Sequence, residues 1–171
     1  NLVEMTTGDK LAPQLIESRL RFSPYIKDAW IVAERDKNYA SAIIIIDYAS
    51  VGRWAGQKKV VYRTFAELSQ KPEVYRLIRG YIDKVNRDLP GSGRVKKYVN
   101  LHKEFSPENG ELTRTRKLKR AFLLKRYRWL VEAIYDDRSE VPVEERTGNS
   151  RNHQAVAKKP TVKVMELATE Q

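Results

Sequence analysis

Cationic and hydroxyl side chains gather in one short segment, Leu112-Thr113-Arg114-Thr115-Arg116-Lys117-Leu118-Lys119-Arg120. The segment follows the tight turn Glu108-Asn109-Gly110-Glu111 and leads into a pattern of apolar residues that predicts a helix. Positive charges, hydroxyl groups and the N-terminus of a helix can together bind a phosphate group. The alternative is a solvated basic helix face that binds nothing, and composition alone favours that alternative.

Three further sets of residues could do chemistry, and each has a structural alternative. The loop Thr6-Thr7-Gly8-Asp9-Lys10 places a glycine among hydroxyls, which can bring backbone N–H groups close to a ligand or can form a plain turn. Tyr127, Trp129 and Tyr135 could stack on nucleic-acid bases, or could be ordinary core and rim aromatics of a helix. His102 is interpreted as a structural or surface residue.

Several kinds of chemistry are excluded by the residues that the chain lacks. Its 171 residues include no cysteine, which excludes a thiolate metal site and a cysteine nucleophile. With two histidines, we expect no metal site in this chain. The sequence has no P-loop pattern, no Gly-x-Gly-x-x-Gly and no Ser-His-Asp order. Hydrophobic residues make up 41% of the chain, which is enough for a packed core and excludes full disorder.

The charge of the chain points to an anionic partner. The formal net charge is +11, which favours nucleic acid, an anionic membrane or a phosphate-bearing small molecule. The excess is local, because one fifteen-residue stretch contains eight cations and no acid. These residues, the basic cluster, are Arg114, Arg116, Lys117, Lys119, Arg120, Lys125, Arg126 and Arg128.

The location of the protein is expected to be cytoplasmic, with peripheral contact to the inner face of a membrane through the basic cluster. No basic-then-apolar leader opens the sequence. The longest apolar run, residues 42–46, is too short to span a bilayer.

The spacing of apolar residues predicts an α+β domain that would position these side chains. Its centre is a small sheet of about three strands flanked by helices, with an N-terminal β-turn segment and a C-terminal β-hairpin extension whose loop, residues 147–159, should be mobile. The expected helices are 13–21, one capped by Ser50 that contains residues 51–55, 65–69, 72–89 and a long one over 118–135. The expected strands are 29–33, 40–48, 95–101, 141–143 and 161–165, and the β-branched strand 40–48 should be covered on both faces.

A family resemblance appears at Gly110-Glu111-Leu112-Thr113-Arg114-Thr115-Arg116-Lys117-Leu118-Lys119-Arg120. This segment resembles the last conserved motif of the AMP-forming adenylate synthetases, in the version of the long-chain fatty acid–CoA ligases. Gly8-Asp9-Lys10-Leu11-Ala12-Pro13-Gln14-Leu15-Ile16-Glu17 is similar to the glycine-containing loop and helix of that family. Other matching segments lie in the family's order: Ser23-Pro24-Tyr25-Ile26, Trp54-Ala55, Val85-Asn86 and Tyr135. The resemblance covers residues 1–136, and residues 137–171 form an extension.

The resemblance implies the C-terminal mobile (lid) domain of a fatty acid–CoA ligase. In that family, ATP and a carboxylate give an acyl adenylate and pyrophosphate, and the thiol of CoA then gives acyl-CoA and AMP. The small domain rotates between the two steps. ATP, CoA and Mg²⁺ would be bound mainly by or with a larger N-terminal adenylation domain, which would be the partner of this chain. The chain alone is then expected to be inactive, and no nucleic-acid partner is expected.

The family's functional residues carry over by position. Lys117 matches the catalytic lysine of adenylate formation, and a lysine is cationic at neutral pH, so it can oppose charge at the α-phosphate. The resemblance also implies cofactor-binding residues at Thr7, Gly8, Asp9, Lys10, Thr113 and Thr115, the first four along the pantetheine channel. The sequence departs from the family at Arg114, where proline is frequent, and at Arg116, where the wider superfamily has glycine. The alternative function is a basic module that binds nucleic acid or an anionic membrane.

Overall fold

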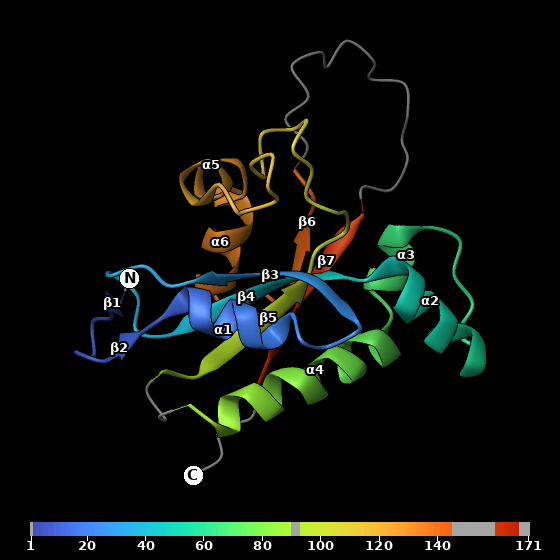
Figure 1. Cartoon of the computed structure of the whole chain (residues 1–171), viewed down its shortest axis with the longest axis horizontal. Coiled ribbons are helices and arrows are strands. Elements are labelled where there is room, and N and C mark those ends of the chain that lie inside the picture. Colours follow the sequence, from blue (N-terminus) through green and yellow to red (C-terminus); the bar gives the residue numbers. More distant parts are fainter. Residues whose placement is uncertain (1, 90–92, 145–159, 168–171) are drawn as a thin grey trace.

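A computed structural model describes residues 2–89, 93–144 and 160–167 of the chain. Its centre is a five-stranded sheet in the order β3-β4-β5-β7-β6, and β1 and β2 form a separate two-stranded sheet (Figure 1). Strands β4 and β5 are parallel, and the other neighbours are antiparallel. The strands are β1 (Val3–Glu4), β2 (Lys10–Leu11), β3 (Ile26–Val32), β4 (Ala40–Ile46), β5 (Val95–Asn100), β6 (Glu140–Pro142) and β7 (Thr161–Glu166).

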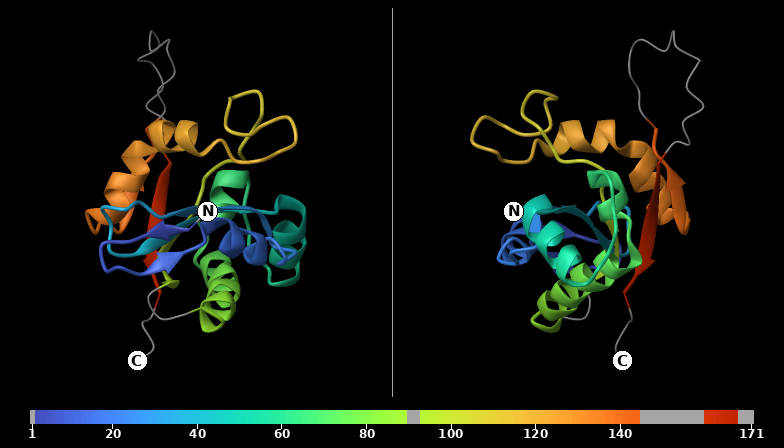
Figure 2. Two further views of the ribbon diagram at one scale, coloured as in Figure 1. Left: turned by 60° about the vertical axis from the view of Figure 1, so that its left-hand side comes forward. Right: turned by 90° about the vertical axis from the view of Figure 1, so that its right-hand side faces the viewer.

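Helices cover both faces of this sheet (Figures 1 and 2). The chain passes from β4 to β5 through three helices, because parallel strands need a long crossover connection. The α1 and α4 side carries one core, and the α5 and α6 side carries the other. The helices are α1 (Pro13–Leu20), α2 (Tyr48–Gln57), α3 (Phe65–Ser69), α4 (Pro72–Arg87), α5 (Arg120–Arg126) and α6 (Arg128–Tyr135). None of the helices described is long and apolar enough to cross a membrane.

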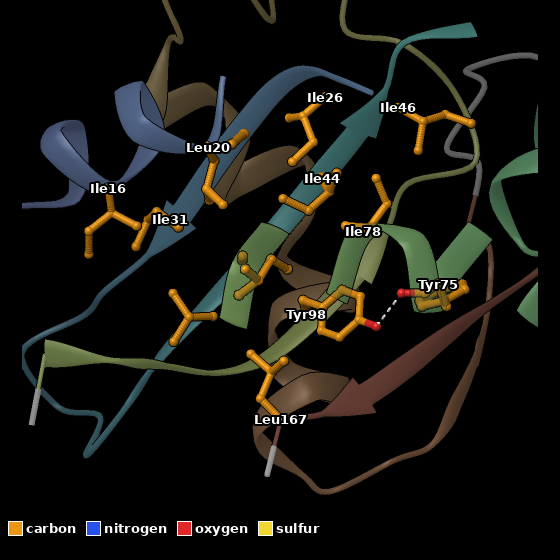
Figure 3. Close-up of a cluster of buried hydrophobic side chains, with 14 of the residues drawn as sticks. Ile16, Leu20, Ile26, Ile31, Ile44, Ile46, Tyr75, Ile78, Tyr98 and Leu167 are labelled. Atoms are coloured by element: carbon orange, nitrogen blue, oxygen red, sulfur yellow. Dashed lines mark hydrogen bonds between the residues drawn. The ribbon is translucent and has the colours of Figure 1, made fainter. Parts of the chain in front are cut away.

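The side chains of β4 alternate between the two cores, which confirms the expectation of a strand covered on both faces. Ile44 and Ile46 pack with Ile16 and Ile78 on the α1 and α4 side (Figure 3). Ile43 and Ile45 point into the opposite core. All seven residues of β4 are buried, so this strand is the centre of the fold.

The C-terminal hairpin belongs to the central sheet. Strand β7 pairs with β5, with Lys97 opposite Glu166 and Val99 opposite Val164. A hydrogen bond from the Tyr75 hydroxyl to the Lys163 carbonyl, 2.7 Å, adds a link to α4. The sheet therefore has five strands where the sequence predicts about three, because the two hairpin strands extend it. The expected loop of residues 147–159 lies outside the described residues.

The expected single helix over residues 118–135 is wrong. Two helices, α5 and α6, meet at Tyr127, which has φ −105° and ψ 22°, and the chain changes direction there (Figure 1). The Tyr127 side chain is buried, and its hydroxyl donates a hydrogen bond to the Glu111 carboxylate. Because of this break, the apolar residues of α6 pack onto the sheet. The Tyr127 side chain contacts Glu111, which precedes α5 in the chain.

Candidate functional site

Lys117 ends a hairpin loop of residues 113–117, the Lys117 loop. The Thr113 N–H donates to the Lys117 carbonyl at 2.8 Å, and the Arg116 N–H donates to the Thr113 carbonyl at 2.9 Å. A β-bridge between Leu112 and Leu118 closes the base. Arg116 has φ +62°, so the loop is a turn followed by a left-handed residue.

Because residues 113–117 form this hairpin loop, the prediction that Lys117 stands at the start of a helix is wrong. Residues 117–119 are not helical, and α5 begins at Arg120 and has seven residues. The phosphate chemistry of this segment would therefore come from its side chains. The Lys117 side chain is exposed and forms no ion pair within the described part of the chain.

The two threonines of the loop lie close together. Their Oγ1 atoms are 3.2 Å apart, and Thr113 Oγ1 also accepts a hydrogen bond from the Lys117 N–H at 3.0 Å. Thr115 is exposed and Thr113 is half-buried. The structure thus gathers Thr113, Thr115 and Lys117 in one small turn.

A buried carboxylate holds the base of this loop. Glu111 is fully buried and accepts hydrogen bonds from the Tyr127 hydroxyl and from the Ser106 N–H, the latter at 3.2 Å. Arg126 Nε lies 3.6 Å from its Oε2. The Lys119 N–H donates to the Glu111 carbonyl at 3.0 Å. Burial, and then the nearby carboxylate, raise the pKa of the Tyr127 hydroxyl, which therefore stays a donor.

A second buried carboxylate ties the end of the segment to α1. Glu17 is 2% exposed and accepts two hydrogen bonds from the Arg120 guanidinium, one of them 2.9 Å long. Its Oε2 also accepts from the Ile31 N–H at 2.7 Å. A bidentate arginine pair of this kind fixes direction as well as distance. Arg120 is thus a structural residue that joins α5, α1 and β3.

A third buried carboxylate faces the loop itself. Asp28 on β3 lies 4.0 Å from the Arg116 guanidinium, measured between Oδ2 and Nη2. Burial raises the pKa of the Asp28 carboxyl, and the positive charges of Arg116, Arg21 and Lys27 oppose that rise. Arg116 therefore interacts with the domain beneath the loop while its backbone holds the left-handed conformation.

Half of the basic cluster is engaged within the domain. Four of its eight cations, Arg116, Arg120, Arg126 and Arg128, lie within 4.0 Å of a carboxylate oxygen. The aromatic residues of the same region are also engaged, since Tyr127 is buried and the Tyr135 hydroxyl donates to the Tyr39 carbonyl at 2.9 Å. This arrangement favours the interpretation of core and rim aromatics over a surface for stacking bases. His102 is buried at the end of β5.

The loop of residues 5–9, the Gly8 loop, joins β1 to β2. The Met5 N–H donates to the Asp9 carbonyl at 2.8 Å, and the Gly8 N–H donates to the Met5 carbonyl at 2.9 Å. Gly8 has φ +84°, a value that favours glycine. The Thr7 hydroxyl donates to Asp9 Oδ2 at 2.7 Å. Thr7, Gly8 and Lys10 are exposed, so the loop is accessible.

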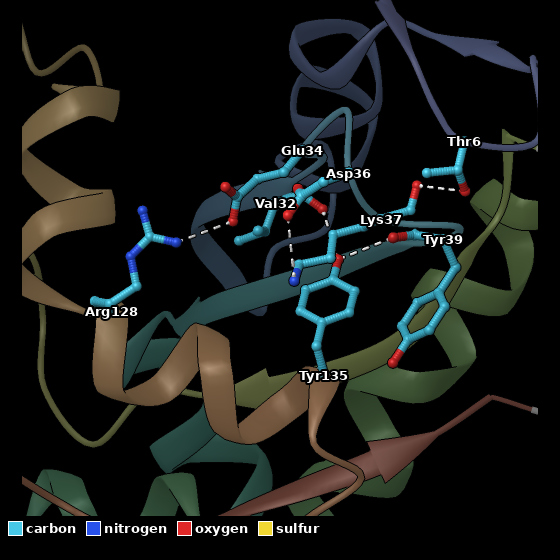
Figure 4. A network of polar contacts seen from close by, with 8 residues as sticks. All are labelled: Thr6, Val32, Glu34, Asp36, Lys37, Tyr39, Arg128 and Tyr135. Atoms are coloured by element: carbon cyan, nitrogen blue, oxygen red, sulfur yellow. Dashed lines mark hydrogen bonds and ion pairs between the residues drawn. The ribbon is translucent and has the colours of Figure 1, made fainter.

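The turn between β3 and β4 supports this loop (Figure 4). The Thr6 N–H and hydroxyl donate to the Lys37 carbonyl at 3.1 and 3.2 Å. On its other side the same turn contacts α6, through the hydrogen bond from Tyr135 to Tyr39 and the ion pair of Arg128 with Glu34. A shallow depression of about 420 Å³ beside the loop is lined by Leu2, Glu4, Met5, Lys10 and Arg35.

The Gly8 loop and the Lys117 loop lie on different parts of the surface. Figures 1 and 2 show the segment that carries the Lys117 loop projecting beyond the sheet, away from β1 and β2. The sequence prediction therefore names two separate sites. Its catalytic and threonine residues form one, and residues 7–10 form the other.

Sequence reasoning missed the three buried carboxylates. Glu17 and Asp28 lie next to apolar residues in the sequence, whereas Glu111 stands in a polar turn, and each of the three is at most 7% exposed. A carboxylate within an apolar segment is the signal that could have found Glu17 and Asp28, because buried acids need a partner. No such local signal marks Glu111. The described residues contain no group of three or more His, Cys, Asp or Glu that could hold a metal ion, and we assign no residue of this chain to Mg²⁺.

Known proteins resemble this chain in sequence over a fraction of their length. It is 28% identical over 130 residues to the long-chain-fatty-acid–CoA ligase FadD15 of Mycobacterium tuberculosis, covering 75% of this chain and 22% of that protein. It is 28% identical over 138 residues to human long-chain-fatty-acid–CoA ligase 1, covering 79% of this chain and 20% of that protein. The chain thus spans about a fifth of the length of these relatives.

The fold is also shared with a solved structure. The adenylation domain of a carboxylate reductase from Mycobacterium chelonae matches with a TM-score of 0.63 and 21% identity, over 80% of this chain and 20% of that chain. A family model described as the AMP-binding enzyme C-terminal domain matches residues 1–139. These matches confirm the resemblance to adenylate-forming enzymes. The chain therefore belongs to the family of AMP-binding enzyme C-terminal domains.

Proposed function

We propose that this chain is the mobile C-terminal domain of an AMP-forming long-chain fatty acid–CoA ligase. The names of the relatives support the substrate class, since both are long-chain-fatty-acid–CoA ligases. The observation that carries the role of this domain is the exposed Lys117 on a loop whose base is held by buried Glu111. A larger adenylation domain would bind ATP and fatty acid and would be the partner of this domain.

Lys117 is the catalytic residue of the first step in this proposal. ATP supplies the adenylyl group, which the fatty acid carboxylate accepts at the α-phosphorus with release of pyrophosphate. The Lys117 ammonium binds both the carboxylate and an α-phosphate oxygen, and so opposes the negative charge that builds there. The hydroxyls of Thr113 and Thr115, 3.2 Å apart beside the lysine, fit the same phosphate-bearing ligand as hydrogen-bond donors.

The Gly8 loop serves the second step. After a rotation of the domain, Thr7, Gly8, Asp9 and Lys10 line the channel through which the thiol of CoA reaches the acyl adenylate. The separation of the two loops supports this rotation, because one pocket would face each loop in turn (Figure 2). The exposure of Thr7, Gly8 and Lys10 fits such a contact.

Lys117→Ala in the intact ligase tests the proposal through its two half-reactions. Adenylate formation, measured by pyrophosphate exchange, is expected to fall by on the order of 10²–10³-fold, because one contact to the developing charge is lost. Thioester formation from supplied acyl adenylate and CoA should stay close to the native rate. Lys119→Ala is the matched control, since Lys119 is also an exposed cation and lies two residues away.

Three outcomes would contradict the proposal. Native rates for both half-reactions of Lys117→Ala would make Lys117 part of a basic surface only. Equal losses in Lys117→Ala and Lys119→Ala would indicate a general effect of charge. Formation of acyl-CoA by the 171-residue chain alone would exclude the need for a partner domain.

A further inference from the structure

A second basic surface lies outside both loops, between the end of α2 and the start of α4. It is a groove of about 800 Å³, the basic groove, on the side where α2 and α4 approach each other (Figure 1). Its lining includes four cations, Lys58, Lys59, Lys71 and Arg76, and one acid, Glu73. Its apolar lining includes Trp54, Val60, Val61 and Leu77.

The cations of this groove differ from those of the basic cluster in their partners. None of the four lies within 4.0 Å of a carboxylate oxygen in the described parts of the chain, whereas four of the eight cluster cations do. Their charge is therefore available to an outside anion. All four groove cations are thus without a carboxylate partner in the described chain, whereas half of the cluster cations are held by carboxylates of the domain.

The backbone places one of these cations at an unfavourable position. Lys59 follows α2 with φ +58°, in the left-handed conformation that favours glycine or asparagine at the end of a helix. The Val60 N–H donates to the Ala55 carbonyl at 2.9 Å and so closes this end. A lysine at such a position keeps a charge on the rim of the groove at some cost in backbone energy.

An apolar side chain stands beside these charges. Val61 is 81% exposed, which is high for a valine, and Trp54 is half-buried in the groove. Cations, an exposed aliphatic side chain and a tryptophan together are typical of surfaces that enter the headgroup region of a bilayer.

We propose that the basic groove binds the surface of an anionic phospholipid membrane. A phospholipid carries a phosphate group and acyl chains, and so matches both the cations and the apolar side chains that line the groove. This placement differs from the sequence expectation, which puts membrane contact on the basic cluster. The proposal is independent of Lys117 and of any ligase activity.

Vesicle sedimentation of the 171-residue chain tests the proposal. Binding to vesicles with about 30% phosphatidylglycerol is expected at about 50 mM salt, and loss of binding at about 500 mM salt, because exposed charges are screened. Each Lys or Arg near such a surface is worth about fivefold in affinity. The triple variant Lys58→Gln, Lys71→Gln, Arg76→Gln should therefore bind on the order of 100-fold more weakly.

A matched triple variant separates the two basic surfaces. Arg114→Gln, Lys119→Gln, Lys125→Gln removes the same charge from exposed cluster positions that have no ion pair within the described chain. It should bind vesicles within about threefold of the native chain. A loss in this variant as large as in the groove variant would overturn the proposal. Circular dichroism of each variant checks the fold.

A single dye label locates the contact independently of charge. The chain has no cysteine, so Val61→Cys can be labelled at one site with an environment-sensitive dye. We expect a blue shift and a gain in emission with the anionic vesicles, and no change for a dye at Lys125→Cys. No shift at Val61 would overturn the proposal. Failure of the native chain to bind vesicles at low salt, with binding of a polyglutamate peptide instead, would reassign the groove to an acidic protein.

Discussion

The Gly8 loop and the Lys117 loop have the same backbone hydrogen bonds and different supports. In each, the N–H of the first residue donates to the carbonyl of the fifth, and the N–H of the fourth donates to the carbonyl of the first. The fourth residue is left-handed in both, and it is Gly8 in one loop and Arg116 in the other. The same turn geometry is thus formed with glycine, which favours the left-handed conformation, in one loop and with arginine, which does not, in the other.

The difference lies in what is buried beneath each loop. The Lys117 loop rests on Glu111, with Glu17 and Asp28 nearby, and these three carboxylates are at most 7% exposed. The Gly8 loop is held by two contacts of Thr6 to one carbonyl and by an exposed pair, Thr7 with Asp9. Buried polar contacts fix a loop more firmly than exposed ones, because nothing else can satisfy them. We therefore expect the Lys117 loop to be the more rigid of the two.

The largest effect should come from removing one acid at each loop, the buried Glu111 beneath the Lys117 loop and Asp9 within the Gly8 loop. Glu111→Ala leaves the Tyr127 hydroxyl and the Ser106 N–H without their acceptor and is expected to lower the free energy of unfolding by about 3–5 kcal/mol. Asp9→Ala removes the exposed hydrogen bond between Thr7 and Asp9 and should change the free energy of unfolding by less than about 0.5 kcal/mol. Urea denaturation of both variants measures the contrast. Similar losses in the two variants would show that burial does not distinguish the loops.

Substitutions at the left-handed residue of each loop, Gly8 and Arg116, should change the free energy of unfolding by a smaller amount and in opposite directions. Gly8→Ala is expected to destabilise the domain by about 1 kcal/mol through the backbone alone, since no atom lies within 4 Å of the added Cβ. Arg116→Gly should stabilise it by up to about 1 kcal/mol, because strain at φ +62° is released. The free energy of unfolding from urea denaturation measures both changes.

Thr115→Gly is the control for this pair. It adds the same flexibility to the unfolded chain at a position without positive φ, so it should destabilise by about 0.5–1 kcal/mol. If Arg116→Gly lost as much stability as Thr115→Gly, the contact of Arg116 with Asp28 would outweigh the backbone strain.

Most of the fold could be predicted from the sequence because its elements have regular patterns. The helix over residues 65–69 has the expected bounds, and the apolar stripe of α4 matches its expected start at Pro72. The four isoleucines predict a strand covered on both faces, which the structure confirms. The local spacing of apolar residues is sufficient to predict such elements, since contacts with the rest of the fold do not change their backbone conformation.

Features that depend on distant contacts could not be predicted. The apolar pattern continues through Tyr127 without a break, and the two helices separate where Tyr127 reaches Glu111, sixteen residues away. The pairing of β7 with β5 likewise joins segments far apart in the chain. For the site, motif resemblance places Lys117, Thr113 and Thr115 together, but the role of Arg116 depends on Asp28, and no local pattern connects them.

The smallest effect should be a shift in the titration of Asp28, which probes the contact beneath the Lys117 loop. Burial raises the pKa of Asp28 above the usual 3.8, and Arg116 lowers it. A raised pKa means that the native state keeps a proton that the unfolded state has lost, so stability falls as pH rises from about 3.8 through the native value. Arg116→Gly should raise the Asp28 pKa further and extend this fall to higher pH. Carbon-13 NMR of the carboxyl group, with Asp28→Asn to assign the signal, measures the shift. An unchanged titration in Arg116→Gly would mean that the 4.0 Å approach carries no interaction, and the Lys117 loop would then depend on Glu111 and Glu17 alone.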